Sequence, residues 1–220
     1  MEKNNLEYLD KSKIMAYLKC PVLFKERYLD GKPFQTNIYI ERGSQIHDFI
    51  KNFWDVMKIN PHLNNFQIPN FFDNEVNSMA QNFLAFQYNR FKILMDKNRL
   101  DLFLPVYYEE KFTNEKQKIK GVVDIVTKEL DGKLSLVEVK SGKNKELTPA
   151  LELEIGFYDY LLCSLGIIVN YGVVYFPKTN DFIKFDLVHD YFGMKNIIEN
   201  IRVNINNNTF EHKEHCGCDG

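Results

Sequence analysis

Residues 121–140, GVVDIVTKELDGKLSLVEVK, specify the centre of this fold, because they read as two β-strands (118–130 and 133–141) joined by a tight turn. Val and Ile dominate both halves, as is typical of strands, and the Asp131-Gly132 pair between them is a strong hairpin signal. The strands nevertheless carry Asp124, Glu138 and Lys140. Charged side chains are rarely buried unless they are paired or bind a metal. These three residues therefore indicate either a functional site or an exposed cross-strand ladder.

The length of the turn decides whether the two acids meet. Side chains alternate along a strand, so Glu138 and Lys140 project from the same face. A two-residue turn would place Asp124 opposite Val139, whereas an odd-length turn with a Gly bulge places Asp124 opposite Glu138. Facing residues lie within roughly 5.5 Å, close enough for two carboxylates to share one divalent ion. The functional interpretation therefore predicts an odd-length turn or a bulge.

Two carboxylates beside a lysine suit the metal-assisted hydrolysis of a phosphodiester. Carboxylate oxygens bind Mg²⁺ or Mn²⁺, and such an ion polarises a phosphate and lowers the pKa of water. A neighbouring lysine can orient that water or stabilise the phosphate. The alternative is an exposed Glu–Lys ladder, which contributes only a few tenths of a kcal/mol. The pattern of charges alone leaves both interpretations open.

The rest of the chain switches between helical and strand periodicity. Residues 1–100 are mainly helical, 101–188 contain the strands, and 189–220 form a closing helix and a tail rich in Cys and His. The expected helices are 12–30 (interrupted at Cys20-Pro21), 42–58, 73–97, 148–166 and 189–208, and the further expected strands are 102–112, 167–177 and 182–188. This order predicts one domain, 1–220, of the α/β class: a mixed central β-sheet flanked by helices, with an N-terminal helical segment.

The composition limits the class of protein. With 220 residues, 45% of them hydrophobic, the chain can bury a sizeable core. No long apolar run and no signal-like start are visible, so we expect a soluble, cytoplasmic protein without a membrane partner. The net charge of −2 means that any contact with nucleic acid must be local, through clustered Lys and Arg. Four unevenly placed cysteines do not form a secreted disulfide framework.

The motif GVVD, followed by EVK on the next strand, resembles the core motif of the PD-(D/E)xK nuclease superfamily. Three outlying features are similar to RecB/AddB-type nucleases and the related CRISPR-associated exonucleases, so the resemblance spans residues 11–218. It implies a restriction-endonuclease-like core and a divalent-metal-dependent deoxyribonuclease, an exonuclease acting on DNA ends or single-stranded DNA. It also implies an integrase or helicase partner. The alternative is a catalytically degenerate member that binds DNA or a partner.

The first outlying feature is RGSQIHDFI (42–50), which resembles the G-x-x-x-H helix of this family. The resemblance implies that His47 joins the metal site. The implied ligands of Mg²⁺ or Mn²⁺ are then His47, Asp124, Glu138 and the main-chain carbonyl of Val139.

The second feature is ELEIGFYDY (152–160), which resembles the Q-x-x-x-Y segment of the family. It places Glu154 and Tyr158 one turn apart on the same helix face. Glu154 departs from the pattern, because the family has Gln there and a carboxylate would repel phosphate. The catalytic residues that the resemblance implies are Asp124, Glu138, Lys140, Tyr158 and Glu154.

The third feature is SKIMAYLKCPVLF (12–24), which resembles the family's opening segment with its Cys-Pro pair. In many members that cysteine joins three C-terminal cysteines around a [4Fe–4S] cluster. Here Cys20 matches, but Cys216 and Cys218 are separated by one residue and no further cysteine follows. With His215 or His212 as a fourth ligand, this set suits Zn²⁺ equally well. An iron–sulfur cluster, zinc and no metal remain three alternatives for the tail.

Overall fold

The protein is described by a computed structural model that covers residues 6–33, 36–59, 71, 73–142 and 146–212. Five strands form one sheet in the order β1 (Tyr107–Asn114), β2 (Ile119–Lys128), β3 (Leu134–Val139), β4 (Tyr171–Phe176) and β5 (Asp181–Asp186). The β3–β4 pair is parallel and the other pairs are antiparallel. The helices are α1 (Lys11–Lys19), α2 (Pro21–Tyr28), α3 (Ile38–Ile59), α4 (Asn74–Asp96), α5 (Pro149–Cys163) and α6 (Tyr191–Asn207), with a 3₁₀ turn η3 (Leu100–Leu102). The predicted α/β fold with a mixed sheet is confirmed.

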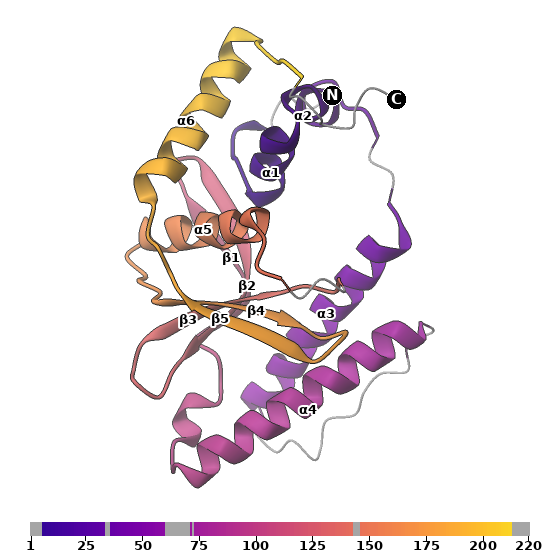
Figure 1. Ribbon diagram of the computed structural model, residues 1–220, viewed down its shortest axis with the longest axis vertical. Helices are drawn as coiled ribbons and strands as arrows, with labels where there is room; N and C mark the ends of the chain where they lie inside the picture. The colour runs from indigo at the N-terminus through magenta and orange to yellow at the C-terminus, as the bar shows by residue number, and fades with distance from the viewer. Residues whose placement is uncertain (1–5, 34–35, 60–70, 72, 143–145, 213–220) are drawn as a thin grey trace.

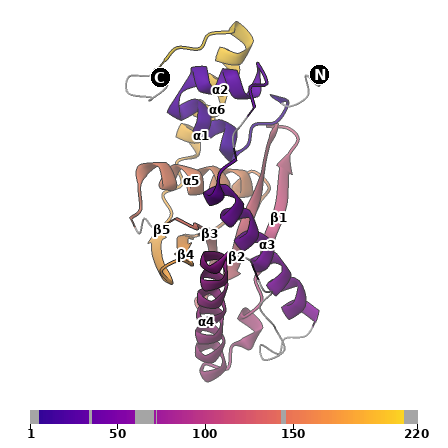
Figure 2. The ribbon, with the colours of Figure 1, turned by 90° about the vertical axis from the view of Figure 1, so that its right-hand side faces the viewer.

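Helices cover both faces of the sheet. Figure 1 shows α5 on one face and α3 and α4 on the other. One apolar cluster joins α5, α1 and α6 to residues such as Leu136 and Val174, and a second joins α3 and α4 to Ile125, Val139 and Tyr175. In the view of Figure 2, α1, α2 and α6 gather at one end of the molecule and α4 lies at the other. The parallel β3–β4 pair requires a crossover, and α5 provides it.

Local sequence sets the helix boundaries. The carboxylate of Asp10 accepts a hydrogen bond from the Lys13 N–H (2.9 Å) and caps α1. Pro21 opens α2 because its missing N–H is not needed in the first turn, which confirms the predicted interruption at Cys20-Pro21. The predicted start of α3 at residue 42 is wrong. Asn37 accepts hydrogen bonds from the Tyr39 and Ile40 N–H groups, so the helix already begins at Ile38.

The predicted strand 102–112 is wrong in its first half. Leu100–Leu102 form a 3₁₀ turn, and β1 begins only at Tyr107. Pro105 has no N–H to donate to a sheet. The Arg90 guanidinium also donates to the carbonyls of Phe103 (2.5 Å) and Leu102 (2.6 Å), so those acceptors are used on the α4 side. The apolar run LFLP therefore packs without becoming a strand.

The turn between β2 and β3 has the odd length that the functional interpretation predicts. The Glu129 N–H donates to the Lys133 carbonyl (2.8 Å), and the Gly132 N–H donates back to the Glu129 carbonyl (3.0 Å), which leaves residues 130–132 as the loop. Gly132 has φ +86°, a conformation that glycine adopts without a steric cost. The ladder pairs Lys128 with Leu134 and Ile125 with Val137, so its next step sets Asp124 opposite Glu138.

The regular geometry of β1 and β2 is interrupted at Asp124. Val123 and Val126 both belong to the core on the α5 side, although strict alternation would place them on opposite faces. Across the pair, Glu109 has φ +43°, and the Glu109–Asp124 step is missing from an otherwise continuous ladder. Both strands therefore depart from regular strand geometry at the same step, at Glu109 in β1 and at Asp124 in β2.

Candidate active site

Asp124 and Glu138 lie deep in the protein, with 5% and 2% of their surfaces exposed. The Asp124 carboxylate continues the sheet pairing after the backbone ladder stops, because its Oδ2 accepts the Val139 N–H at 2.7 Å. This bond fixes the end of β3 against β2 at the point where the two acids face each other. Burial and the charge of Glu138 raise the pKa of Asp124 to about 7.

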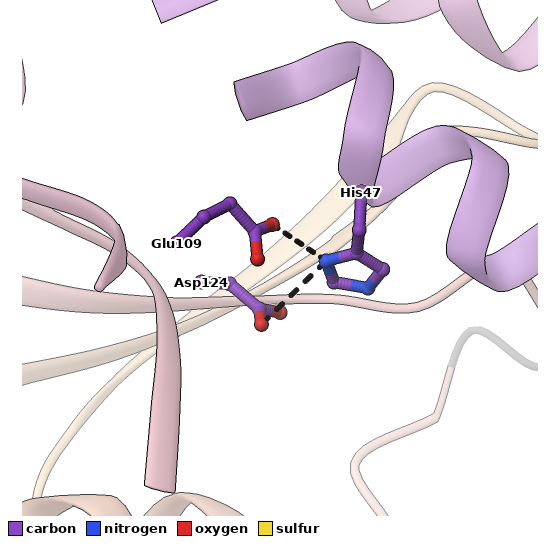
Figure 3. A group of neighbouring side chains, drawn as sticks. All are labelled: His47, Glu109 and Asp124. Atoms are coloured by element: carbon purple, nitrogen blue, oxygen red, sulfur yellow. Dashed lines mark hydrogen bonds and ion pairs between the residues drawn. The ribbon is translucent and has the colours of Figure 1, made fainter. Parts of the chain in front are cut away.

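His47 and Glu109 complete a cluster around Asp124. Figure 3 shows the imidazole reaching from its helix, α3, toward both carboxylates. The His47 Nδ1 atom lies 2.7 Å from Glu109 Oε1 and 3.6 Å from Asp124 Oδ1, and ligand atoms from all three lie within 4.8 Å of one another. Burial alone would lower the pKa of His47, but the hydrogen bond to Glu109 and the charge of Asp124 raise it to about 9. The imidazole of His47 therefore favours its charged form, in which it pairs with both acids.

Two lysines converge on one oxygen of Glu138. Its Oε1 lies 2.6 Å from the Lys11 Nζ and 2.9 Å from the Lys140 Nζ. Burial alone would raise the pKa of Glu138, but the two ammonium groups outweigh burial and hold it below its ordinary value. The second oxygen, Oε2, is buried and has no hydrogen-bond partner among the described residues. A buried carboxylate oxygen without a partner is costly, so this atom requires an explanation.

Glu154 and Tyr158 enclose the lysines from α5. Glu154 forms an ion pair with Lys140 and lies 3.5 Å from the Lys11 Nζ, while the Lys11 ammonium sits 5.0 Å from the centre of the Tyr158 ring. Glu154, where the resemblance predicts Gln, is thus paired with two lysines. Its negative charge is balanced by two lysines, so it need not repel a phosphate. Tyr158 packs beside Gly121, where a Cβ atom would come within 2.8 Å of its ring.

The donor set fits a divalent ion. Carboxylates from Glu109 and Asp124 and the imidazole of His47 form a compact group, and the unpartnered Oε2 of Glu138 adds a hard oxygen in the same buried region. Hard oxygen ligands suit Mg²⁺ and Mn²⁺. The interactions of the acids with Lys11, Lys140 and His47 balance negative charge that would otherwise be buried without compensation.

The structure brings together residues from α3, β2, the end of β3 with the residue that follows it, and α5: His47, Asp124, Glu138, Lys140, Glu154 and Tyr158. The sequence patterns did not reveal Lys11 and Glu109, both of which enter this site. Glu109 lay within a predicted strand as one of two adjacent acids, and only its position opposite Asp124 distinguishes it from Glu110. No local sequence pattern marked Lys11 as a site residue, because its partner Glu138 is 127 residues away in the chain.

The expected tail site falls partly outside the described residues. Cys216, Cys218 and His215 lie there, so the structure does not describe them. Cys20 is fully buried, and its Sγ atom lies 3.7 Å from the His212 Nδ1. The chain after α6 therefore returns to the junction of α1 and α2, close to the one cysteine of the predicted set that is described.

Comparisons with known proteins agree with this geometry. A family model of the PD-(D/E)XK nuclease superfamily matches residues 11–216. No curated protein matches the chain. Among solved structures, a protein from Eubacterium rectale described as a candidate exonuclease has a TM-score of 0.58 at 14% identity, covering 98% of this chain and 87% of that one. SSO0001 has a TM-score of 0.35 at 13% identity, covering 87% of this chain and 85% of that one. Within the described part of the chain, no helix is both long and apolar enough to cross a membrane.

Proposed function

The chain belongs to the PD-(D/E)XK nuclease superfamily, and on that basis we propose that it is a divalent-metal-dependent deoxyribonuclease that hydrolyses phosphodiester bonds. Within the superfamily, the motif pattern favours a RecB/AddB-type enzyme, an exonuclease acting on DNA ends or on single-stranded DNA. The fold shared with the E. rectale protein is consistent with this assignment.

One observation carries the proposal: two buried acids face each other across β2 and β3, and one oxygen of Glu138 has no partner among the described residues. The ion pairs with Lys11 and Lys140 engage only the other oxygen, so they do not satisfy the buried Oε2. A cation between Asp124 and Glu138 would satisfy it. The compact His47–Glu109–Asp124 group beside them supplies further ligands for that cation.

Each residue then has a role. His47, Glu109, Asp124, Glu138 and the main-chain carbonyl of Val139 would hold Mg²⁺ or Mn²⁺. When bound, such an ion polarises the phosphate and lowers the pKa of water.

The remaining residues act around that centre. Lys140 positions the attacking water or stabilises the phosphate, and Glu154 orients Lys140 through their ion pair. Tyr158 supports the lysines through its ring face, on which the Lys11 ammonium rests. Asp124 holds the end of β3 in place through the Val139 N–H.

The family pattern further points to a protein partner and to a metal bound by the tail. An integrase or a helicase would deliver the DNA end. The buried Cys20 beside His212 supports a metal clip between the first helices and the tail, either a [4Fe–4S] cluster or Zn²⁺. Such a clip would close a very long loop and stabilise the fold.

Degradation of end-labelled single- and double-stranded DNA with Mn²⁺, Mg²⁺ or EDTA tests the proposed activity. We expect cleavage with either ion and none in EDTA. Lys140→Ala and Asp124→Ala should each lower the rate by about 100-fold or more, whereas Lys195→Ala on the exposed face of α6 should not. DNA that stays intact in every lane, although the folded protein binds it, would identify a non-cleaving DNA-binding member instead.

A further inference from the structure

A hollow of about 260 Å³ lies next to the candidate active site. It is lined by Lys11, Ser12, Lys111, Lys120, Val122 and Tyr158, together with Asp10 and Gly121. Two of these residues also belong to the site: the Lys11 Nζ contacts Glu138 at 2.6 Å, and Tyr158 lies under the same ammonium. Lys11 and Tyr158 therefore line the hollow and also belong to the candidate active site.

The sheet places the lysines of the hollow on one side. Lys111 pairs with Val122, and Lys120 pairs with Thr113, so both lysines project from the same face of the β1–β2 pair. The segment before α1 joins this edge through hydrogen bonds between Leu9 and the residues around Ile119 (both 3.0 Å). That pairing places the start of α1, with Lys11 and Ser12, in the lining of the hollow.

Among the described residues, two of the three lysines in this hollow lack a carboxylate partner. The Lys11 ammonium is paired with Glu138, whereas Lys111 and Lys120 have no carboxylate within ion-pair distance in that part of the chain. The Lys120 Nζ lies 5.4 Å from the centre of the Tyr8 ring. Asp10 is the one acid in the lining, and it is engaged by Lys13 through the backbone N–H (2.9 Å) and the ammonium (3.6 Å). Burial lowers the pKa of Lys13, and the charge of Lys120 adds to that effect against the attraction of Asp10. Lys120 therefore lies close enough to repel the Lys13 ammonium.

We propose that this hollow binds a phosphate group of the DNA strand, next to the phosphate that is cleaved. The inference rests on the proposed nuclease function and adds a second contact point for the substrate. Two ammonium groups and a hydroxyl are donors that match phosphate oxygens, and the open charge of Lys111 and Lys120 would be neutralised by the ligand. The phosphate is either an internal phosphodiester or a terminal monoester, both of which offer anionic oxygens to these donors.

Binding of an internally labelled single-stranded oligonucleotide, measured by fluorescence anisotropy in EDTA, tests the hollow without requiring cleavage. The double variant Lys111→Gln/Lys120→Gln is compared with Lys92→Gln/Lys195→Gln, which removes the same charge from exposed positions on α4 and α6. We expect the hollow variant to bind on the order of ten-fold more weakly, and its salt dependence should be shallower by about 0.7 in log–log slope for each phosphate that it no longer neutralises. The control pair should match the wild type within about two-fold.

The ends of the oligonucleotide distinguish the two phosphate sources. Substrates with a 5′-phosphate, a 3′-phosphate or hydroxyls at both ends are compared. An equal decrease in affinity on all three identifies an internal phosphodiester, and a decrease confined to one phosphorylated end identifies a terminal monoester. In Mn²⁺, kcat/KM should fall by the same factor as the affinity.

Failure of this inference is distinct from failure of the proposed function. If the wild type cleaves DNA while the hollow and control variants behave alike in affinity and in kcat/KM, the phosphate site is rejected and the nuclease stands. If the wild type neither binds nor cleaves DNA, both proposals fall. Equal melting temperatures for the two double variants ensure that weaker binding by the hollow variant reflects the missing ammonium groups and not a damaged fold.

Discussion

Glu109 has an unusual backbone conformation for a residue within a strand. It adopts φ +43° within a strand, a conformation that costs a non-glycine residue about 1–2 kcal/mol. Backbone strain of this kind is retained where the surroundings require it, often at functional sites. The result here is a carboxylate 2.7 Å from His47, while Glu110, the next residue, is exposed.

We therefore expect Glu109→Gln to weaken Mn²⁺ binding by about 10–100-fold, because the amide removes a charge from the ligand group and weakens the hold on His47. Isothermal titration with Mn²⁺ measures the affinity. Excess Mn²⁺ should restore much of the nuclease rate. Glu110→Gln, one position along the same strand, is the matched control and should bind like the wild type. Equal affinity in both variants would remove Glu109 from the metal site.

The shifted pKa values of His47 and Asp124 predict how the stability of the metal-free protein depends on pH. The folded pKa of His47, about 9, lies above its ordinary value of 6.5, so the stability from its pairing is present below about pH 6.5. That contribution is lost as the pH rises through about 9. Asp124 has a raised pKa of about 7, so its contribution also decreases with rising pH, from its ordinary value of 3.8 upward.

Metal binding must displace these protons, so the apparent affinity for Mn²⁺ should increase from pH 6 to about pH 9. Calorimetry in buffers of different ionisation enthalpy measures the proton release directly. His47→Gln should bind more weakly and lose the upper part of the pH dependence. An affinity that is flat between pH 6 and 9 in the wild type would show that the ion does not contact His47 or Asp124.

At the scale of the elements, contact between β2 and α5 positions Tyr158. Gly121 lets the strand approach the helix, because a Cβ atom there would lie 2.8 Å from the Tyr158 ring and 3.3 Å from Leu161. Both neighbours lie in a tightly packed core. Gly156, on α5 itself, has only Met194 near its Cβ position, at 3.9 Å.

The same substitution should thus have opposite effects at these two glycines. Gly121→Ala should destabilise the protein by about 1–3 kcal/mol through overpacking and lower the nuclease rate by shifting Tyr158. Gly156→Ala should stabilise it by about 0.4–1 kcal/mol, because alanine restricts the unfolded chain and fits the helix. Urea unfolding measures both. A stable, fully active Gly121→Ala protein would mean that Tyr158 can move without consequence.

At the scale of the whole molecule, the proposed tail clip would join the two ends of the described chain. We expect the purified protein to contain a tail metal, with visible absorbance for a [4Fe–4S] cluster and none for Zn²⁺. Cys20→Ser should remove that metal and lower Tm by several degrees, because the long loop between the first helices and the tail is released. Elemental analysis and thermal unfolding measure the two effects.

Cys163→Ser is the control for this experiment, since Cys163 is the last residue of α5 and does not belong to the proposed ligand set. It should keep the tail metal. If the wild type contains no tail metal, the clip is rejected, and the Cys20–His212 contact is part of ordinary packing.

Most of the elements could be predicted from the amino-acid sequence, because periodicity and helix caps are short-range rules. The odd length of the β2–β3 turn, and with it the meeting of Asp124 with Glu138, followed only from the functional interpretation, since Asp131-Gly132 by itself also suits a two-residue turn. The start of β1 was mispredicted because Arg90, on the preceding helix α4, donates to the carbonyls of Leu102 and Phe103.

The other charges of the site are placed by long-range packing, which no local pattern encodes. Lys11 reaches Glu138 because its segment pairs with β2 beside Ile119, and Glu109 reaches His47 because both strands change course at the same step. Each placement depends on how layers far apart in the chain pack together. A buried charge is tolerated only where that packing supplies its partner, so the partners become visible only in three dimensions.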